Sequence, residues 1–116
     1  MPKLKPTASL VASPPTDCPL EECLRIISGA WTHKILWYLK NGPRRFGDLK
    51  RDLGKVSPKV LTTRLRELED EGVIVRKVLP TSPPTVEYSL TPAGHEFGPV
   101  LEAMVQVATK LRRIRK

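Results

Sequence analysis

The sequence predicts a mainly helical domain of the α+β class. Two short amphipathic segments joined by a tight turn occupy residues 46–68, and two segments rich in β-branched residues follow at 73–79 and 86–90. A helical pattern then runs from Thr91 towards the end of the chain. Because 116 residues suffice for one modest hydrophobic core, we expect these elements to form a single small domain.

The composition of the chain changes near residue 17. Residues 1–16 hold four prolines among mostly polar or small side chains, so they bury little and are expected to form a disordered arm. The ordered domain is expected to span residues 17–116. Its first helix is expected to begin at Pro19, with Cys18 as the N-cap and Glu21 in the capping-box position. The buried face of this helix is predicted to carry Leu20, Leu24 and Ile27.

A second helix is predicted over residues 30–40, where Asn41-Gly42-Pro43 ends it. Its apolar side is predicted to carry Trp31, Ile35, Tyr38 and Leu39.

The next segment has the pattern of two helices joined by a tight turn. Leu49 and Leu53 lie four residues apart on one face of the first helix, and Gly54 is placed to end it in a left-handed conformation. Ser57 and Pro58 then fit the N-cap and the first position of the second helix. This arrangement is typical of a helix-turn-helix.

The second of these helices, predicted over residues 57–71, has two contrasting faces. Apolar residues recur at helical spacing and are expected to face the core; they are Leu61, Leu65 and Leu68. The opposite side carries hydrogen-bond donors and no acid, and consists of Lys59, Thr62, Thr63 and Arg66. In a helix-turn-helix the second helix enters the major groove of DNA, so we predict that these four side chains contact base edges. The alternative is an ordinary amphipathic helix with a solvated face.

The two β-rich segments predict a hairpin directly after the helix-turn-helix, because the loop at 80–85 consists of turn-forming residues. A hairpin in this position is a wing, and residues 73–91 are expected to lie on the DNA backbone. Phosphate contacts are predicted for residues of the wing, of the turn and of the segment before it: Arg44, Arg45, Ser57, Pro58, Lys77, Thr81 and Ser82. The alternative is a solvent-exposed hairpin that only covers the core.

The last helix is predicted to begin at Thr91-Pro92 and to reach a basic end at residues 110–116. Pro99 is expected to kink or split it. Its apolar residues form two stripes, Phe97, Leu101, Met104, Ala108 and Leu111 on one and Val100, Val107 and Ile114 on the other. Two stripes exceed what a small domain buries, so we predict a C-terminal dimerisation helix that forms a homodimer seam with the first helix. The alternative is a helix wholly absorbed in its own core.

The charge of the chain favours a polyanionic partner, since the formal net charge is +8 and the pI is about 9.9. The sequence holds neither an apolar run of about 20 residues nor a secretory signal, so we expect a cytoplasmic protein that does not bind membranes. The spacing of His33 and His95 suits neither a metal site nor a catalytic triad, and the glycines form no phosphate loop. We therefore expect no enzymatic activity, no cofactor and no metal.

Short motifs follow one another through residues 17–101: Cys18-Pro19-Leu20, Gly29-Ala30-Trp31, Arg45-Phe46-Gly47-Asp48-Leu49, Ser57-Pro58-Lys59-Val60-Leu61-Thr62, Leu65-Arg66-Glu67-Leu68-Glu69, Gly72-Val73-Ile74 and Val86-Glu87-Tyr88-Ser89-Leu90-Thr91. In these motifs the chain resembles the HxlR family of winged helix-turn-helix transcriptional regulators. The resemblance implies a dimeric, cytoplasmic DNA-binding regulator, often a repressor, whose dimer interface uses the first and last helices. Two departures are Ala30, where the family usually has Lys, and Thr85, where it often has Arg.

The resemblance also implies a redox or electrophile-sensing role for Cys18, because some members of the family use an N-terminal cysteine in this way. A helix N-terminus favours a thiolate, whereas the neighbouring Asp17 and Glu21 oppose it. Cys23 lies about 140° further around the helix, which favours a disulfide across the dimer over an internal one. The alternative is that Cys18 only caps the helix and Cys23 is a small core residue.

Other binding functions also fit the pattern. A dimer with two equivalent recognition helices fits double-stranded DNA with an inverted repeat, its half-sites about one helical turn apart or a multiple of it. A winged helix can instead contact a protein, in which case the basic face would bind an acidic partner. RNA is less favoured, because the aromatic residues form no stacking platform. A ligand pocket between Trp31, Trp37, Tyr38 and the last helix would use residues that core packing also explains.

Overall fold

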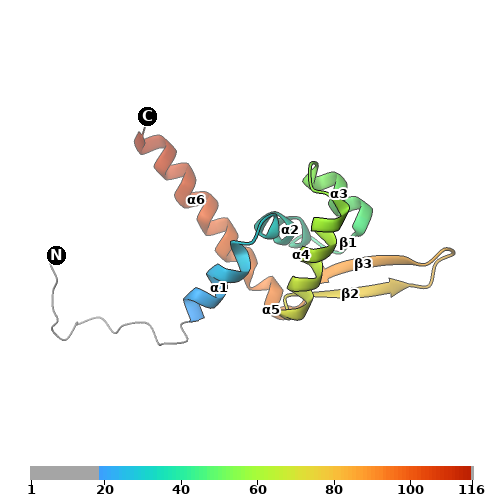
Figure 1. Ribbon diagram of the computed structural model, residues 1–116. Coiled ribbons are helices and arrows are strands. Elements are labelled where there is room, and N and C mark those ends of the chain that lie inside the picture. The colour runs from blue at the N-terminus through green and yellow to red at the C-terminus, as the bar shows by residue number, and fades with distance from the viewer. Residues whose placement is uncertain (1–18, 116) are drawn as a thin grey trace.

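The computed structural model describes residues 19–115. Its elements in chain order are α1 (Pro19–Ile27), α2 (Thr32–Leu39), β1 (Arg44–Arg45), α3 (Phe46–Leu53), α4 (Pro58–Asp70), β2 (Ile74–Leu79), β3 (Thr85–Leu90), α5 (Pro92–His95) and α6 (Phe97–Arg115) (Figure 1). The predicted fold class is confirmed, because a helix-turn-helix of α3 and α4 precedes a hairpin of β2 and β3 in a mainly helical chain. The predicted arm at 1–16 and the capping residue Cys18 lie outside the described residues.

The hydrophobic core lies between α2, α3, α4 and the base of the hairpin. The side chains of Ile35 and Leu49 have no exposed surface. The predicted inner face of α4 is confirmed, because Leu61, Leu65 and Leu68 are all buried. Burial of one such side chain contributes roughly 1.5–3 kcal/mol relative to its exposure. This core therefore fixes the orientation of α4 on the helices beneath it.

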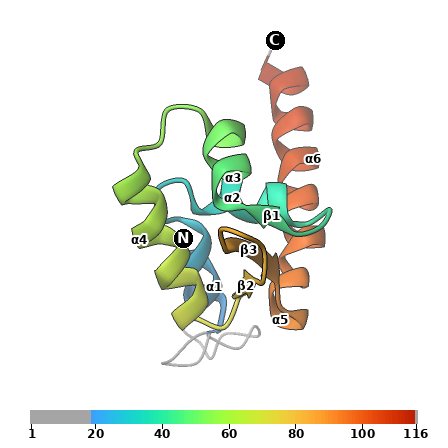
Figure 2. The ribbon, with the colours of Figure 1, turned by 90° about the vertical axis from the view of Figure 1, so that its right-hand side faces the viewer.

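The sheet has three antiparallel strands in the order β1-β3-β2. Ile74 pairs with Leu90 at the base of the hairpin, where both side chains are buried. Strand β1 is missing from the sequence prediction, because two residues after a proline show no alternating pattern; it pairs Arg44 with Tyr88. Viewed along the hairpin, α4 and α6 lie on opposite sides of it (Figure 2). The wing thus leaves the domain beside the helix-turn-helix.

The predicted buried face of α1 is wrong in part. Leu20 and Leu24 are 63% and 48% exposed, and only Ile27 is buried. The reason is that α1 packs mainly against α2 and turns its outer side away from the core (Figure 1). Cys23 is also exposed, so its interpretation as a small core residue is wrong.

Helix α2 begins two residues later than predicted. Trp31 precedes it with φ of 71°, a left-handed conformation that a helix interior does not allow. The predicted apolar side is otherwise confirmed for Ile35 and Leu39, which are buried, and the half-buried Trp31 packs against the core. Tyr38 is wrong, since it is 38% exposed and Leu36 is buried in its place.

The predicted last helix is split. Helix α5 ends at His95, and α6 begins at Phe97 after the single residue Glu96. Pro99 has no N–H to bond the carbonyl of His95 four residues before it, and the helix is interrupted there, as Pro99 predicted. Phe97 and Leu101 are buried, whereas the other large apolar residues of α6 are exposed: Val100, Met104, Val105, Val107, Leu111 and Ile114. The alternative of a helix absorbed in its own core is therefore wrong for the single chain.

Candidate nucleic-acid interface

The turn between α3 and α4 fixes where α4 begins. Gly54 ends α3 with φ of 81°, a backbone conformation that side-chain-bearing residues rarely adopt. Ser57 Oγ accepts a hydrogen bond from the backbone N–H of Val60 at 3.1 Å, and Pro58 takes the first helical position. The predicted cap of α4 is confirmed, and Val56 before it is buried.

The outer face of α4 presents two cationic side chains that no carboxylate among residues 19–115 pairs with. Lys59, Thr63 and Arg66 are exposed and Thr62 is half-buried. Within residues 19–115, neither Lys59 nor Arg66 has a carboxylate within ion-pair distance. The hydroxyl groups of both threonines donate into the helix: Thr62 Oγ1 to the carbonyl of Pro58 (2.8 Å) and Thr63 Oγ1 to that of Lys59 (3.0 Å). Outwards, each threonine therefore offers a methyl group and oxygen lone pairs.

The acidic residues of α4 gather at its other end, and two of them are bound within the protein. Glu67 Oε1 lies 2.9 Å from Arg64 Nη1, and Glu71 pairs with Arg25 of α1. The helix is therefore graded from a basic N-terminal half to a C-terminal half whose acids are partly neutralised. This gradient suits a helix whose first turns approach a polyanion.

The two arginines before α3 differ in their surroundings. Arg44 donates from Nε (3.1 Å) and Nη2 (2.6 Å) to Asp52 Oδ2, so its guanidinium is engaged with a carboxylate. Arg45 is exposed at the N-cap of α3, and its backbone N–H donates to Asp48 Oδ2 at 3.3 Å. Of the two predicted phosphate contacts in this segment, only Arg45 has no ion-pair partner among residues 19–115.

The wing carries the remaining predicted phosphate contacts. Lys77 is exposed on β2, opposite Glu87 of β3. At the tip, Thr81 Oγ1 donates to the carbonyl of Pro83 at 2.7 Å and lies 3.1 Å from Thr85 Oγ1. Ser82 is exposed beside them. The hydroxyl of Thr81 therefore forms hydrogen bonds within the loop.

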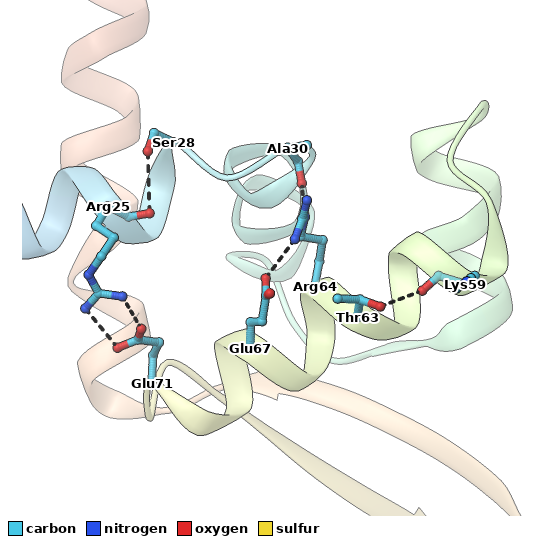
Figure 3. Close-up of polar contacts among 8 residues, drawn as sticks. All are labelled: Arg25, Ser28, Ala30, Lys59, Thr63, Arg64, Glu67 and Glu71. Atoms are coloured by element: carbon cyan, nitrogen blue, oxygen red, sulfur yellow. Dashed lines mark hydrogen bonds and ion pairs between the residues drawn. The ribbon is translucent and has the colours of Figure 1, made fainter.

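Two arginines that connect α4 to the preceding helices are absent from the sequence prediction. Arg64 donates from Nε to the carbonyl of Ala30 at 3.0 Å, and Arg25 binds Glu71 at the end of α4 (Figure 3). The hydrogen bond from Arg25 holds the pKa of Glu71 below its ordinary value, and the same contact raises the pKa of Arg25. The partners are 34 and 46 residues apart along the chain, so no local pattern in the sequence reveals them.

Besides the outer face of α4, the described part of the chain has a groove of about 620 Å³ between α2 and α6, lined among others by Trp37, Tyr38 and Met104. Among residues 19–115 there is no group of three or more His, Cys, Asp and Glu side chains placed to hold a metal ion. His33 and His95 are both exposed. None of the helices described has the length and apolar character needed to cross a membrane.

These features define a winged helix-turn-helix protein. The model of the HxlR-like helix-turn-helix family matches residues 26–115, and the chain belongs to this family. The resemblance predicted from the motifs is thereby confirmed.

Related proteins carry names that agree with this family. The HTH-type transcriptional regulator YdeP of Bacillus subtilis is 44% identical over 84 residues, or 72% of this chain and 66% of YdeP. The match thus spans just under two thirds of YdeP. A crystal structure from Enterococcus faecalis, named for the MarR family of transcriptional regulators, is similar with a TM-score of 0.80 at 30% identity, covering 92% of this chain and 97% of that one.

The reduced form of the redox regulator HypR is also similar, with a TM-score of 0.77 at 33% identity over 83% of this chain and 95% of that one. The family is a helix-turn-helix family, and the relatives from Bacillus subtilis and Enterococcus faecalis are named transcriptional regulators.

Proposed function

We propose that this protein is a cytoplasmic transcriptional repressor that binds double-stranded DNA sequence-specifically as a homodimer. The observation that carries the proposal is the outer face of α4, where Lys59 and Arg66 are exposed without ion-pair partners among residues 19–115. A recognition helix spanning residues 57–71 would enter the major groove, and a wing at 73–91 would follow the backbone.

Four side chains of α4 are proposed to contact base edges. Arg66 and Lys59 suit the O6 and N7 acceptors of guanine. Thr62 and Thr63 present a methyl group to thymine or accept from the amino group of adenine or cytosine, because their own hydroxyl protons are donated within the helix. The helix therefore combines two cationic donors with two threonines that contact thymine methyl groups or accept from base amino groups.

The phosphate contacts are proposed at both sides of the groove. The N-terminus of α4, with Ser57 and Pro58, points its dipole at a phosphate. Arg45 lies on the adjoining segment, and Lys77, Thr81 and Ser82 lie on the wing. Arg44 would contact a phosphate while it stays bound to Asp52, because two of its guanidinium nitrogens already donate to that carboxylate.

The homodimer is proposed to form through α1 and α6. Both helices expose apolar residues that the single chain does not cover, including Leu24 and Met104. Helix α1 carries acids in its first turn, and α6 carries arginines in its last turn. An isologous interface brings each patch against its own copy, so a patch with both signs can complement itself. The region 17–116 would then act as one DNA-binding and dimerisation domain.

Redox control is a second part of the proposal, supported by the likeness to HypR, which is named a redox regulator. Cys18 would be the sensing thiol; it lies outside the described residues, one residue before α1. Oxidation would join thiols of two subunits in a disulfide, and an oxidant such as diamide would take up the two electrons and two protons. Diamide should then change the DNA affinity of the wild-type protein and leave that of Cys18→Ser unchanged. An equal response of both proteins would contradict the role of Cys18.

The central test compares two variants that each remove one positive charge. Arg66→Ala should weaken binding to the preferred sequence by roughly 1–3 kcal/mol and relax the preference at one base position. Lys77→Ala should weaken binding to all sequences alike and reduce the salt dependence by about one phosphate contact. The measurement is fluorescence anisotropy with specific and random DNA at several salt concentrations.

Lys40→Ala is the matched control, because it also removes one positive charge and Lys40 pairs with Glu102 of α6, not with a residue of α4. Equal losses on specific and random DNA for every variant would contradict base reading by α4. The basic face would then be assigned to an acidic protein partner.

A further inference from the structure

A surface cleft lies at the junction between α1 and α4. This cleft of about 300 Å³ separates the two helices and is lined by residues from both, among them Arg25, Gly29, Glu67 and Glu71. Ile26 and Leu68 are the apolar residues that line the cleft, and the other lining residues are polar or glycine. Polar contacts therefore help to set the orientation of α1 relative to α4 at this point.

Polar contacts cross the junction at two places (Figure 3). Arg25 reaches from α1 to both carboxylate oxygens of Glu71, at the C-terminal end of α4. Arg64, two turns earlier on α4, donates to the carbonyl of Ala30 in the segment between α1 and α2. Residues 64 and 71 are seven positions apart and lie on one side of the helix. Both contacts thus hold the rear of α4, opposite the side that carries Lys59 and Arg66.

The arginine of the second contact is itself held in place. Arg64 Nη1 lies 2.9 Å from Glu67 Oε1, one turn further along the same helix. Its guanidinium therefore bridges a carboxylate on α4 and a backbone carbonyl outside α4. A planar guanidinium with several fixed donors suits such a bridge better than the single ammonium of lysine.

Helix α1 is connected on its other side to the proposed dimer surface. Leu20 and Leu24 are exposed on α1, and Cys23 is exposed between them. A change in the dimer interface or in the thiols would act on α1 first. The contacts of Arg25 and Arg64 connect α1 and the segment that follows it to the recognition helix α4.

We propose that Arg25 and Arg64 are positioning residues, which couple the orientation of the recognition helix to α1 and hence to the dimer interface. This inference rests on the proposed function. Exposed ion pairs contribute little to stability, so the effect of Arg25 should appear in DNA recognition and not in the fold. A helix that turns slightly in the groove loses base contacts, whereas contacts to phosphates tolerate the change.

The test uses the full chain and the variant Arg25→Ala, with a preferred DNA sequence and a random one. Its affinity for the preferred sequence should fall about five- to tenfold, with a smaller loss on random DNA and an unchanged thermal midpoint. The loss of one positive charge weakens binding to both DNAs alike. The ratio of the affinity for the preferred sequence to that for random DNA therefore reports only the orientation of the recognition helix. The charge-swapped variant R25E/E71R should recover most of that ratio.

Lys40→Ala is the matched control. Lys40 pairs with Glu102 at 3.0 Å and joins α2 to α6, so its removal also breaks an ion pair between helices without touching α4. The affinity ratio of this variant should equal that of the wild type. Glu71→Gln, which keeps the shape of the side chain, should behave like Arg25→Ala.

The outcomes separate this inference from the proposed function. If the wild type has no preferred DNA sequence, the proposed function fails and this inference fails with it. If the wild type is specific and Arg25→Ala has the same affinity ratio as Lys40→Ala, only the coupling role is overturned. A fall in the thermal midpoint that accounts for the whole loss of affinity would likewise assign Arg25 to the fold and overturn the inference.

Discussion

Helices α4 and α6 are both amphipathic, but within the single chain only α4 has its apolar face buried. The apolar residues of α4 are buried by α2, α3 and the hairpin, and its exposed residues are polar. In α6 only Phe97 and Leu101 are buried, and the apolar residues beyond them face solvent while the helix projects from the domain (Figure 1). The outer face of α4 therefore suits a charged partner such as DNA, and that of α6 suits an apolar one such as a second copy of the chain.

The largest effect that follows from this comparison is on folding. Leu65→Ala removes a fully packed side chain from the inner face of α4, and the free energy of unfolding should fall by roughly 2–5 kcal/mol. Chemical denaturation followed by circular dichroism measures this loss. A value below about 1 kcal/mol would contradict the packing of α4 described above.

The inner face of α4 was predictable because its residues are close in sequence. Leu61, Leu65 and Leu68 follow the helical period, and Ser57 with Pro58 marks the start of the helix. The wing was predictable for the same reason, since alternating strands flank a run of turn-forming residues.

The outer contacts were not predictable because they depend on distant residues. Whether Leu24 is buried depends on what lies against α1, which the period of the helix does not specify. Arg25 and Glu71 meet only after the chain has folded, and so do β1 and β3. Sequence patterns identify the face of a helix that is apolar; the tertiary fold decides what covers it.

The next effect concerns α6 and tests whether its exposed apolar residues are covered by a second copy of the chain. Val107→Glu places a charge in the exposed apolar stripe and should weaken the proposed dimer about tenfold or more. Sedimentation equilibrium measures the dimer dissociation constant. Gln106→Glu adds the same charge at a neighbouring position that is already polar, and its effect should be smaller. A dimer unaffected by Val107→Glu would show that this stripe lies outside the interface.

The smallest effect concerns the junction between α1 and α4. The hydrogen bond from Arg25 holds the pKa of Glu71 below its ordinary value of 4.5. This contact therefore stabilises the fold above the pKa that Glu71 has in the unfolded chain. The stabilisation is lost as the pH falls through the lower pKa of the folded protein.

In Arg25→Ala the pKa of Glu71 should rise towards its ordinary value, which a carbon-13 NMR titration of the side-chain carboxyl group measures. An identical pKa in both proteins would mean that the ion pair does not form in solution.

The most direct test of the whole account is a selection of preferred sequences from a pool of random double-stranded DNA by the wild-type protein. Two recognition helices joined through α1 and α6 predict enrichment of an inverted repeat whose half-site centres lie about 10 base pairs apart, or a multiple of that distance. Enrichment of a single half-site would contradict the dimer, and a pool that stays random through repeated rounds would contradict sequence-specific binding by α4.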